Sequence, residues 1–265
     1  MITTEQIKKL RDQTGVSVMQ CKHALEETLG DFDKALLVLK KKSTDIALKK
    51  NDRTLGSGLV VIKKDAGKAV MAVLYCETDF VAKNDEFIKL ANQIANIAFE
   101  KGEEAAKNES AELINLLIQK TGENIKLGEI YIFEGDTLGS YVHNGKAGVL
   151  VSLEGGPLTE LRVNTQTIAQ DIAMHITAMK PEFTNRENIP EETKESIASL
   201  FAEEVKILDK PEEIKKKIID GKIDAYFKER TLLDQVFIKN PDITIAELLK
   251  QAGNAKIKEF VRFSF

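Results

Sequence analysis

The chain has 265 residues, of which 43% are hydrophobic and 30% charged, and its formal net charge is −4. This balance is typical of a soluble globular protein and argues against general nucleic-acid binding. No apolar run reaches the ~18–20 residues of a membrane span, and Met1–Glu5 lack the features of a secretory signal. We therefore expect a cytoplasmic protein without a membrane or direct nucleic-acid partner, whose cysteines, Cys21 and Cys76, are unpaired thiols.

Three short helices are predicted within residues 2–50, because apolar residues recur at helical spacing between breaks at Thr14-Gly15 and Gly30-Asp31. We expect a small helical module with little core of its own, followed by a polar linker over residues 43–54. The lysines between residues 40 and 50 favour a solvated helix end over a nucleic-acid patch, since cations suit a helix C-terminus.

From residue 55 onward, three landmarks occur twice in the same order. The pairs are Leu55-Gly56-Ser57 with Leu138-Gly139-Ser140, Gly67-Lys68-Ala69 with Gly145-Lys146-Ala147, and Leu90-Ala91 with Ile168-Ala169. This pattern predicts a duplicated strand–turn–strand–helix unit. We expect an α+β fold whose core has two subdomains, residues 55–137 and residues 138–187 with 231–265, each an antiparallel sheet with helices on one face.

The pattern of apolar and charged residues over 188–230 predicts a hairpin of two charged amphipathic helices, with Pro190 at the start and a break near Pro211. Each helix has one apolar stripe. The stripes consist of Ile197, Leu200, Phe201 and Val205, and of Ile214, Ile218, Ile219, Ile223 and Phe227. The hairpin either packs on its own subdomain or exposes this surface to a partner or to a second copy of the chain.

Residues 78–83 connect a predicted buried strand, Ala69–Tyr75, to an amphipathic helix that Asn84 starts. Phe80 is a large apolar side chain in this connection. It either packs beneath the start of the helix as a hydrophobic staple or belongs to a functional loop at the surface. The local sequence alone favours the staple.

The repeat shifts this balance towards a functional loop. At the place of residues 78–81, the second copy has Gly156-Pro157-Leu158-Thr159. The scaffold is therefore repeated while this loop differs, although Leu158 is available as a staple for the second copy.

No arrangement of residues points to an enzyme. His143 and His175 lack partners at metal-ligand spacing, and His23 has only Cys21, two residues away, which points in another direction on a helix. Cys76 has no identified base. Neither a Gly-x-Ser-x-Gly motif nor a phosphate-binding glycine loop is present. We expect a protein without enzymatic activity and without a cofactor or metal.

Three stretches resemble motifs of the translation elongation factor Ts family, and the resemblance spans nearly the whole chain. They are residues 7–25, with Ile7-Lys8-Lys9-Leu10-Arg11 and Met19-Gln20-Cys21-Lys22; residues 78–84; and residues 175–183. The resemblance implies a ubiquitin-associated-like module at residues 1–54, a core of two subdomains, and a coiled-coil hairpin at residues 188–230 that forms a homodimer.

Members of this family are guanine-nucleotide exchange factors of elongation factor Tu. The resemblance implies binding to GDP-loaded and nucleotide-free elongation factor Tu, and insertion of Thr78, Asp79, Phe80 and Val81 into the partner. This insertion would disturb the Mg²⁺ and phosphate site and release GDP. Further contacts are implied for Arg11, Met19, Lys22, Gly122 and His143. The alternative is a chaperone-like accessory that binds the same partner without nucleotide exchange.

Overall fold

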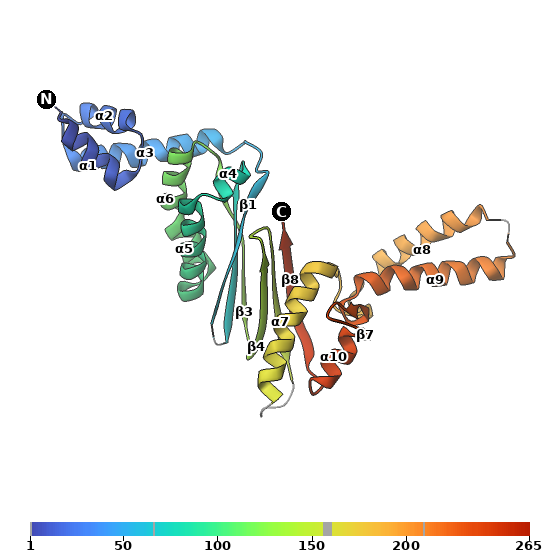
Figure 1. Cartoon of the computed structure of the whole chain (residues 1–265). Coiled ribbons are helices and arrows are strands. Elements are labelled where there is room, and N and C mark those ends of the chain that lie inside the picture. Colours follow the sequence, from blue (N-terminus) through green and yellow to red (C-terminus); the bar gives the residue numbers. More distant parts are fainter. Residues whose placement is uncertain (1, 66, 156–160, 209) are drawn as a thin grey trace. The chain divides into compact units, whose positions relative to one another are not determined.

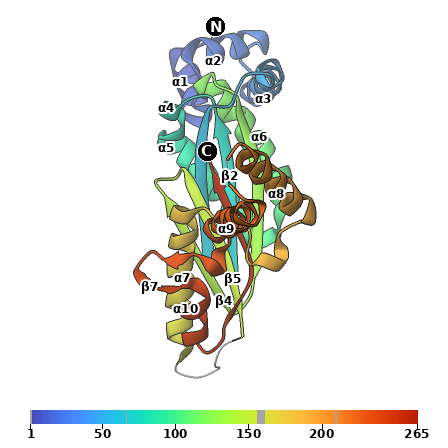
Figure 2. The same cartoon turned by 90° about the vertical axis from the view of Figure 1, so that its right-hand side faces the viewer.

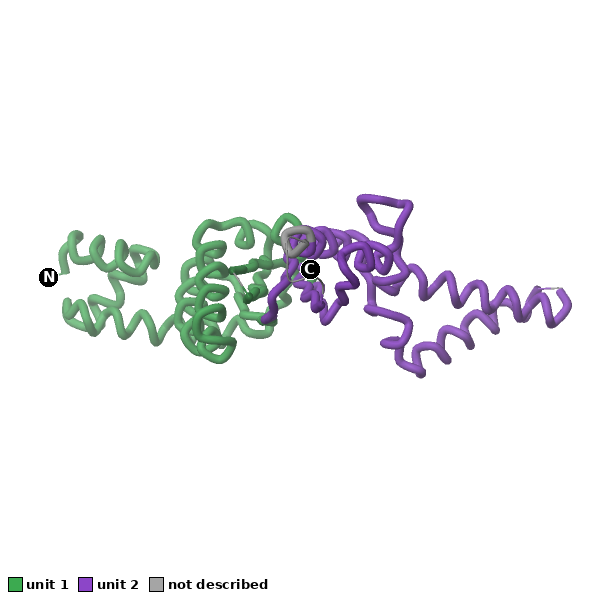
Figure 3. The backbone as a smooth tube through the Cα atoms, turned by 90° about the horizontal axis from the view of Figure 1, so that it is seen from below, with its two compact units in different colours: residues 1–132, 142–148, 263–265 green, residues 133–141, 149–262 purple. Residues whose placement is uncertain are grey.

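The structure is a computed structural model that describes residues 2–65, 67–155, 161–208 and 210–265. Its helices and sheets confirm the predicted α+β class (Figures 1 and 2). Two compact units are present: unit 1 comprises residues 1–132, 142–148 and 263–265, and unit 2 comprises residues 133–141 and 149–262 (Figure 3). Among the helices in the described ranges, none combines the length and hydropathy that a membrane span needs.

Unit 1 begins with three helices, α1 (Thr4–Thr14), α2 (Val18–Glu27) and α3 (Phe32–Lys50). Their N-caps are Thr3, Ser17 and Asp31, each of which accepts a backbone N–H bond from the first turn. Both α1 and α2 pack against the first half of α3. Their small core consists of Leu10, Val16, Cys21, Ala24, Leu25, Ala35 and Leu39. Likeness to a ubiquitin-associated domain stays a prediction.

The prediction of a polar linker from residue 43 is wrong, because α3 continues to Lys50. Residues 40–50 lack glycine and proline and are rich in good helix formers. Ser43 is buried, and Ile46 and Ala47 pack against the main core of unit 1. One continuous helix therefore contributes to both cores of unit 1.

The sheet of unit 1 has the strand order β1-β2-β3. Its strands are β1 (Ser57–Asp65), β2 (Lys68–Cys76) and β3 (Ile125–Glu134), and β1 pairs antiparallel with β2 from Ser57↔Cys76 to Asp65↔Lys68. Helices α5 (Asp85–Lys101) and α6 (Glu103–Thr121) share its core. Asn84 caps α5, as predicted, and the helix is amphipathic, as expected: Phe87, Leu90, Ala91, Ile94, Ala95 and Ala98 are buried.

The second sheet has the order β4-β5-β8, from β4 (Thr137–His143), β5 (Ala147–Glu154) and β8 (Lys256–Ser264). Helix α7 (Leu161–Met179) follows β5, and the strand–turn–strand–helix order therefore occurs twice, as predicted. A two-stranded sheet of β6 (Val236–Phe237) and β7 (Asn240–Thr244) leads into α10 (Ile245–Gln251), which packs beside α7 in the core of unit 2. Thr244 caps α10 with a capping box.

Two helices of unit 2, α8 (Glu191–Lys206) and α9 (Glu212–Arg230), form the predicted hairpin (Figure 3). Short 3-10 helices flank it at Arg186–Asn188 and Leu232–Asp234. At its base, Arg186 binds the carboxylates of Asp224 and Asp234. The two apolar stripes are divided: Val205 and Phe227 are buried, whereas Leu200 and Ile214 are exposed. Its description as a coiled coil stays a prediction.

Glycines at matching places in the two copies have different surroundings. A Cβ atom at Gly139 of β4 would lie 1.9 Å from the backbone oxygen of Ala169 in α7. At Gly56, the nearest atom would be the backbone oxygen of Glu77, at the ordinary contact distance of 3.4 Å. Helix α7 therefore packs directly on the strand where Gly139 lies, and no side chain fits between them.

We predict that Gly139→Ala lowers the free energy of unfolding by about 2–3 kcal/mol, because a backbone group must move to admit the methyl group. Gly56→Ala is the matched control and should change it by less than about 0.5 kcal/mol. Urea unfolding followed by circular dichroism measures both. Equal effects of the two substitutions would contradict the close packing at Gly139.

Candidate functional site

The connection between β2 and α5 contains a single helical turn, α4 (Asp79–Ala82). Thr78 is its N-cap, and the Val81 N–H donates to the Thr78 hydroxyl oxygen over 3.4 Å. Val81 and Ala82 are buried, whereas Asp79 and Phe80 are exposed. The turn is therefore anchored on one side by the core and presents two side chains outward.

Phe80 has 83% of its surface exposed, so its interpretation as a hydrophobic staple is wrong. Phe87, in the first turn of α5, is instead fully buried, and Val81 belongs to the same core. The stretch expected to provide a second staple, Gly156–Thr159, lies outside the described residues. An aromatic side chain this exposed, at the tip of an ordered turn, is available to contact another molecule.

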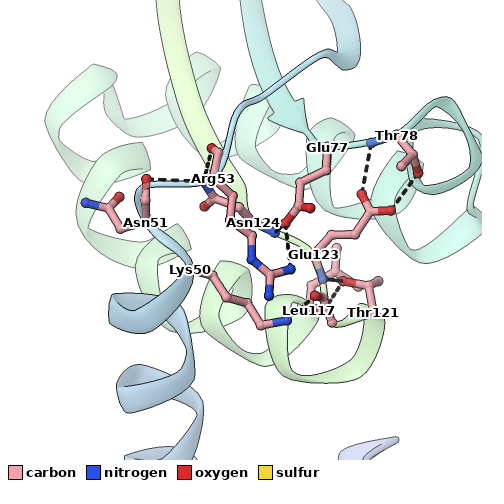
Figure 4. A network of polar contacts seen from close by, with 10 residues as sticks. Lys50, Asn51, Arg53, Glu77, Thr78, Leu117, Thr121, Glu123 and Asn124 are labelled. Atoms are coloured by element: carbon pink, nitrogen blue, oxygen red, sulfur yellow. Dashed lines mark hydrogen bonds and ion pairs between the residues drawn. The ribbon is translucent and has the colours of Figure 1, made fainter.

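Two carboxylates connect the start of α4 to the segment between α6 and β3 (Figure 4). Glu123 accepts hydrogen bonds from the Thr78 N–H over 3.1 Å and from the Thr78 hydroxyl over 2.5 Å. In the opposite direction, Glu77 accepts the N–H of Asn124 over 2.5 Å. Each connection thus provides a carboxylate for a backbone N–H of the other. We call this reciprocal pair the acidic clamp.

Gly122 lies immediately before Glu123 of the acidic clamp. It ends α6 with a φ of 76°, a left-handed conformation that suits glycine. The Lys50 ammonium donates to the Gly122 carbonyl, and the Asn124 amide donates to the carbonyls of Asn51 and Arg53 over 3.3 and 3.0 Å (Figure 4). The end of α3 and the predicted contact residue Gly122 are therefore fixed to the same network as α4.

His143 lies at the end of β4 and is exposed. Its carbonyl accepts the N–H of Lys146 over 2.9 Å, which closes the turn between β4 and β5. The Lys146 ammonium donates to the Ser57 hydroxyl over 2.6 Å and to the Gly58 carbonyl over 3.1 Å. This turn is thereby attached to the start of β1 within unit 1, the unit that also contains α4.

Charges around α4 keep Asp79 ionised. The Lys83 ammonium lies 2.7 Å from the Asp79 carboxylate, and this hydrogen-bonded ion pair, with a smaller contribution from Lys146, lowers the pKa of Asp79 below its ordinary value. The exposed tip of the turn therefore carries one carboxylate beside one aromatic ring at neutral pH.

Cys76 is a buried thiol just before the turn. Burial, with the nearby Glu123 carboxylate, raises the pKa of Cys76 to about 11. Its thiol donates to the Thr78 carbonyl over 3.1 Å. Burial also raises the pKa of Cys21. Both cysteines are unpaired, as predicted, and their protonated thiols are poor nucleophiles at neutral pH.

The remaining predicted site residues, Arg11, Met19 and Lys22, are exposed on α1 and α2. These helices belong to the small N-terminal core and not to the network around α4. Across the described ranges, no group of three or more His, Cys, Asp and Glu residues is placed to hold a metal ion. The structure thus brings residues 78–81 together with Gly122 and leaves the N-terminal residues as a separate surface.

The sequence analysis did not identify Glu77, Glu123 or the helical turn itself. For the turn a signal existed, because Thr78 followed by Asp79 is a helix N-cap followed by a first-turn acid. For the acidic clamp there was none, since its partners lie far apart in the sequence and no periodic pattern connects them.

Comparison with known proteins gives one consistent family. The family model described as "Elongation factor TS" matches residues 77–265. Elongation factor Ts of Alkalilimnicola ehrlichii is 36% identical over 275 residues, which cover 99% of this chain and 91% of that protein. The proteins of the same name from Hydrogenobaculum sp. and Aquifex aeolicus are 39% and 38% identical, over 99% of this chain and 98% and 97% of their own lengths.

The exposure of Phe80 predicts how stability responds to its loss. Phe80→Ala should change the free energy of unfolding by less than about 0.5 kcal/mol, because its ring contributes little to the core. Phe87→Ala, in contrast, should cost about 3–5 kcal/mol, because Phe87 is fully buried. Urea unfolding of the two variants tests this. A comparable loss for Phe80→Ala would restore the staple interpretation.

Proposed function

The chain belongs to the elongation factor Ts family and is a translation elongation factor; from this premise we propose that it promotes release of GDP from elongation factor Tu. The observation that carries the proposal is Phe80, an aromatic ring that is 83% exposed on a turn whose inner side is buried. An exposed aromatic side chain on a fixed backbone is suited to enter a pocket of a partner protein.

The energy available from this contact is substantial. Transfer of a Phe side chain from water into a protein core contributes roughly 1.5–3 kcal/mol. Because α4 already holds its backbone in one conformation, little further conformational entropy is lost on binding. Val81 and Thr78 support the turn from beneath, and Asp79 adds a negative charge beside the ring.

In the proposed mechanism, Asp79 and Phe80 insert between helices of the nucleotide-binding domain of the partner. Groups that hold Mg²⁺ are displaced, and because Mg²⁺ bridges the protein and the nucleotide phosphates, the hold on GDP weakens. A factor that binds the nucleotide-free partner more tightly than the GDP-bound one must lower the affinity for GDP by the same factor. No covalent bond changes, so the activity is exchange by binding and not enzymatic catalysis.

Further contacts would provide affinity without disturbing the nucleotide. Arg11, Met19 and Lys22 are exposed on the N-terminal helices, and 56% of the Met19 surface is accessible. Gly122 and His143 are exposed in the two segments attached to the α4 region. We assign these five residues to docking, and residues 78–81 to release of the nucleotide.

The second candidate is an accessory that binds elongation factor Tu like a chaperone and leaves the nucleotide in place. Both proposals use the same exposed surface. They differ in the rate of GDP dissociation, which a chaperone-like accessory would not change.

We further propose that residues 188–230 mediate a homodimer. Leu200 and Ile207 expose 59% and 86% of their surfaces on the hairpin, while Val205 and Phe227 are buried within it. The buried residues hold α8 against α9, and the exposed residues are available to a second copy.

The exchange proposal is tested by dissociation of fluorescent GDP from elongation factor Tu. The wild-type chain should accelerate dissociation, and Phe80→Ala should reduce the maximal rate by at least about ten-fold, as expected when the burial of an aromatic ring is lost. Leu48→Ala is the matched control, because Leu48 is 70% exposed on α3 of the same unit. Unaccelerated dissociation with the wild-type chain would favour the accessory; equal rates for Phe80→Ala would remove Phe80 from the mechanism.

The dimer proposal is tested by sedimentation equilibrium. The wild-type chain should associate in a concentration-dependent manner, and Ile207→Glu with Leu200→Glu should weaken association because charges then replace exposed apolar surface. Lys216→Glu, at an exposed position of α9, is the control. A monomer at all concentrations would contradict the dimer.

A further inference from the structure

We propose that Glu123 is a positioning residue for nucleotide exchange: it fixes the direction in which α4 presents Phe80 without itself needing to contact the partner. This inference rests on the proposed function and extends it to a residue outside the exposed tip. Its basis is the pair of hydrogen bonds from Thr78 to the Glu123 carboxylate, 3.1 Å from the N–H and 2.5 Å from the hydroxyl (Figure 4).

Helix α4 is too short to define its own direction. It contains four residues, and its helical bonds are those from the Ala82 N–H to the Thr78 carbonyl and from the Lys83 N–H to the Asp79 carbonyl, each 3.2 Å long. A single turn is marginal in isolation, because one or two bonds cannot offset the cost of ordering its backbone. The turn must therefore be held from outside.

Thr78 is the residue through which it is held. Its hydroxyl oxygen accepts the N–H of Val81, one residue beyond Phe80, while its hydroxyl hydrogen and its own N–H both point to Glu123. Hydrogen bonds to a carboxylate are stronger than those between neutral groups. Glu123 therefore fixes the first residue of the turn by two bonds, and Phe80 lies two residues further along.

The other half of the acidic clamp allows this role to be tested separately from the fold. Glu77 accepts the N–H of Asn124 and is paired with Arg53 at 3.4 Å. When Glu123 is replaced, the bond from the Asn124 N–H to Glu77 still joins the segment before α4 to the segment between α6 and β3. Thr78 then loses its two hydrogen bonds to Glu123, while the Cys76 thiol still donates to its carbonyl and the sheet and α5 keep their own contacts.

Without Glu123, α4 should adopt several directions, and only a fraction of the molecules then presents Phe80 in the direction needed for insertion. That fraction multiplies the maximal rate of GDP release. Docking through the distant N-terminal residues is not affected. Loss of Glu123 should therefore lower the maximal rate and leave the half-saturating concentration of the factor nearly unchanged.

The experiment is a GDP-release titration of elongation factor Tu with six forms of the full chain: wild type, Glu123→Ala, Glu123→Gln, Phe80→Ala, the double variant Glu123→Ala with Phe80→Ala, and the control Glu109→Ala. We expect Glu123→Ala to lower the maximal rate about ten-fold, the size expected for lost bonds to a charged acceptor. Glu123→Gln should be intermediate, since its amide oxygen still accepts the Thr78 N–H. Glu109→Ala is the control. Glu109 lies on α6 and, like Glu123, accepts hydrogen bonds through both carboxylate oxygens, in this case from Lys101.

The double variant distinguishes positioning from general damage. If Glu123 acts through Phe80, its removal has no further effect once Phe80 is gone, and the double variant matches Phe80→Ala. If Glu123→Ala lowers the rate by the same factor in both backgrounds, the inference is overturned. A wild-type maximal rate for Glu123→Ala would overturn it as well.

Amide hydrogen exchange of the unbound chain separates this inference from the proposed function. Glu123→Ala should speed exchange at the Thr78 and Val81 amides at least ten-fold and leave the amides of β1 and β2 unchanged. Unchanged exchange at Thr78 would overturn the positioning role while wild-type activity stands. A wild-type chain that fails to accelerate GDP release would instead overturn the proposed function, and with it any role of Glu123 in exchange.

Discussion

The direction of a single helical turn is the constraint on which this site depends. α4 has too few hydrogen bonds of its own to hold Phe80 in one place. Burial of Val81 and Ala82 fixes its inner side, and the acidic clamp fixes its start. The segments that provide this support, β2 before the turn and the end of α6 beyond it, are parts of the main core of unit 1. A stable core thus supports a small exposed turn.

The two copies of the strand–turn–strand–helix unit show how one scaffold supports different uses. The first copy carries Asp79 and Phe80 between its second strand and its helix. In the second copy, the strand at Gly139 is packed against the backbone of α7, whereas the matching Gly56 has room around it. Exposure of a large aromatic ring in one copy carries no evident benefit for folding. Its presence is best explained by a contact with another protein.

Local patterns allowed much of the fold to be predicted from the sequence. Helical spacing and the Asn84 cap located α5, because these signals act within a few residues. The length of α3 was missed because lysines were interpreted as a solvated end, although Ile46 and Ala47 face a core. Exposure of Phe80 and its support by Glu123 depend on contacts between segments distant in sequence, about which periodicity carries no information.

The central claim is that Phe80 enters the partner, and site-specific photo-crosslinking tests it most directly. A photoreactive phenylalanine analogue at position 80 should crosslink to the nucleotide-binding domain of elongation factor Tu when GDP is absent, and more weakly when GDP is in excess. The same analogue at position 48, also exposed in unit 1, provides the comparison. Efficient crosslinking at position 80 that is weakened by excess GDP would support the account. No crosslink from position 80 in a complex that otherwise forms would contradict it.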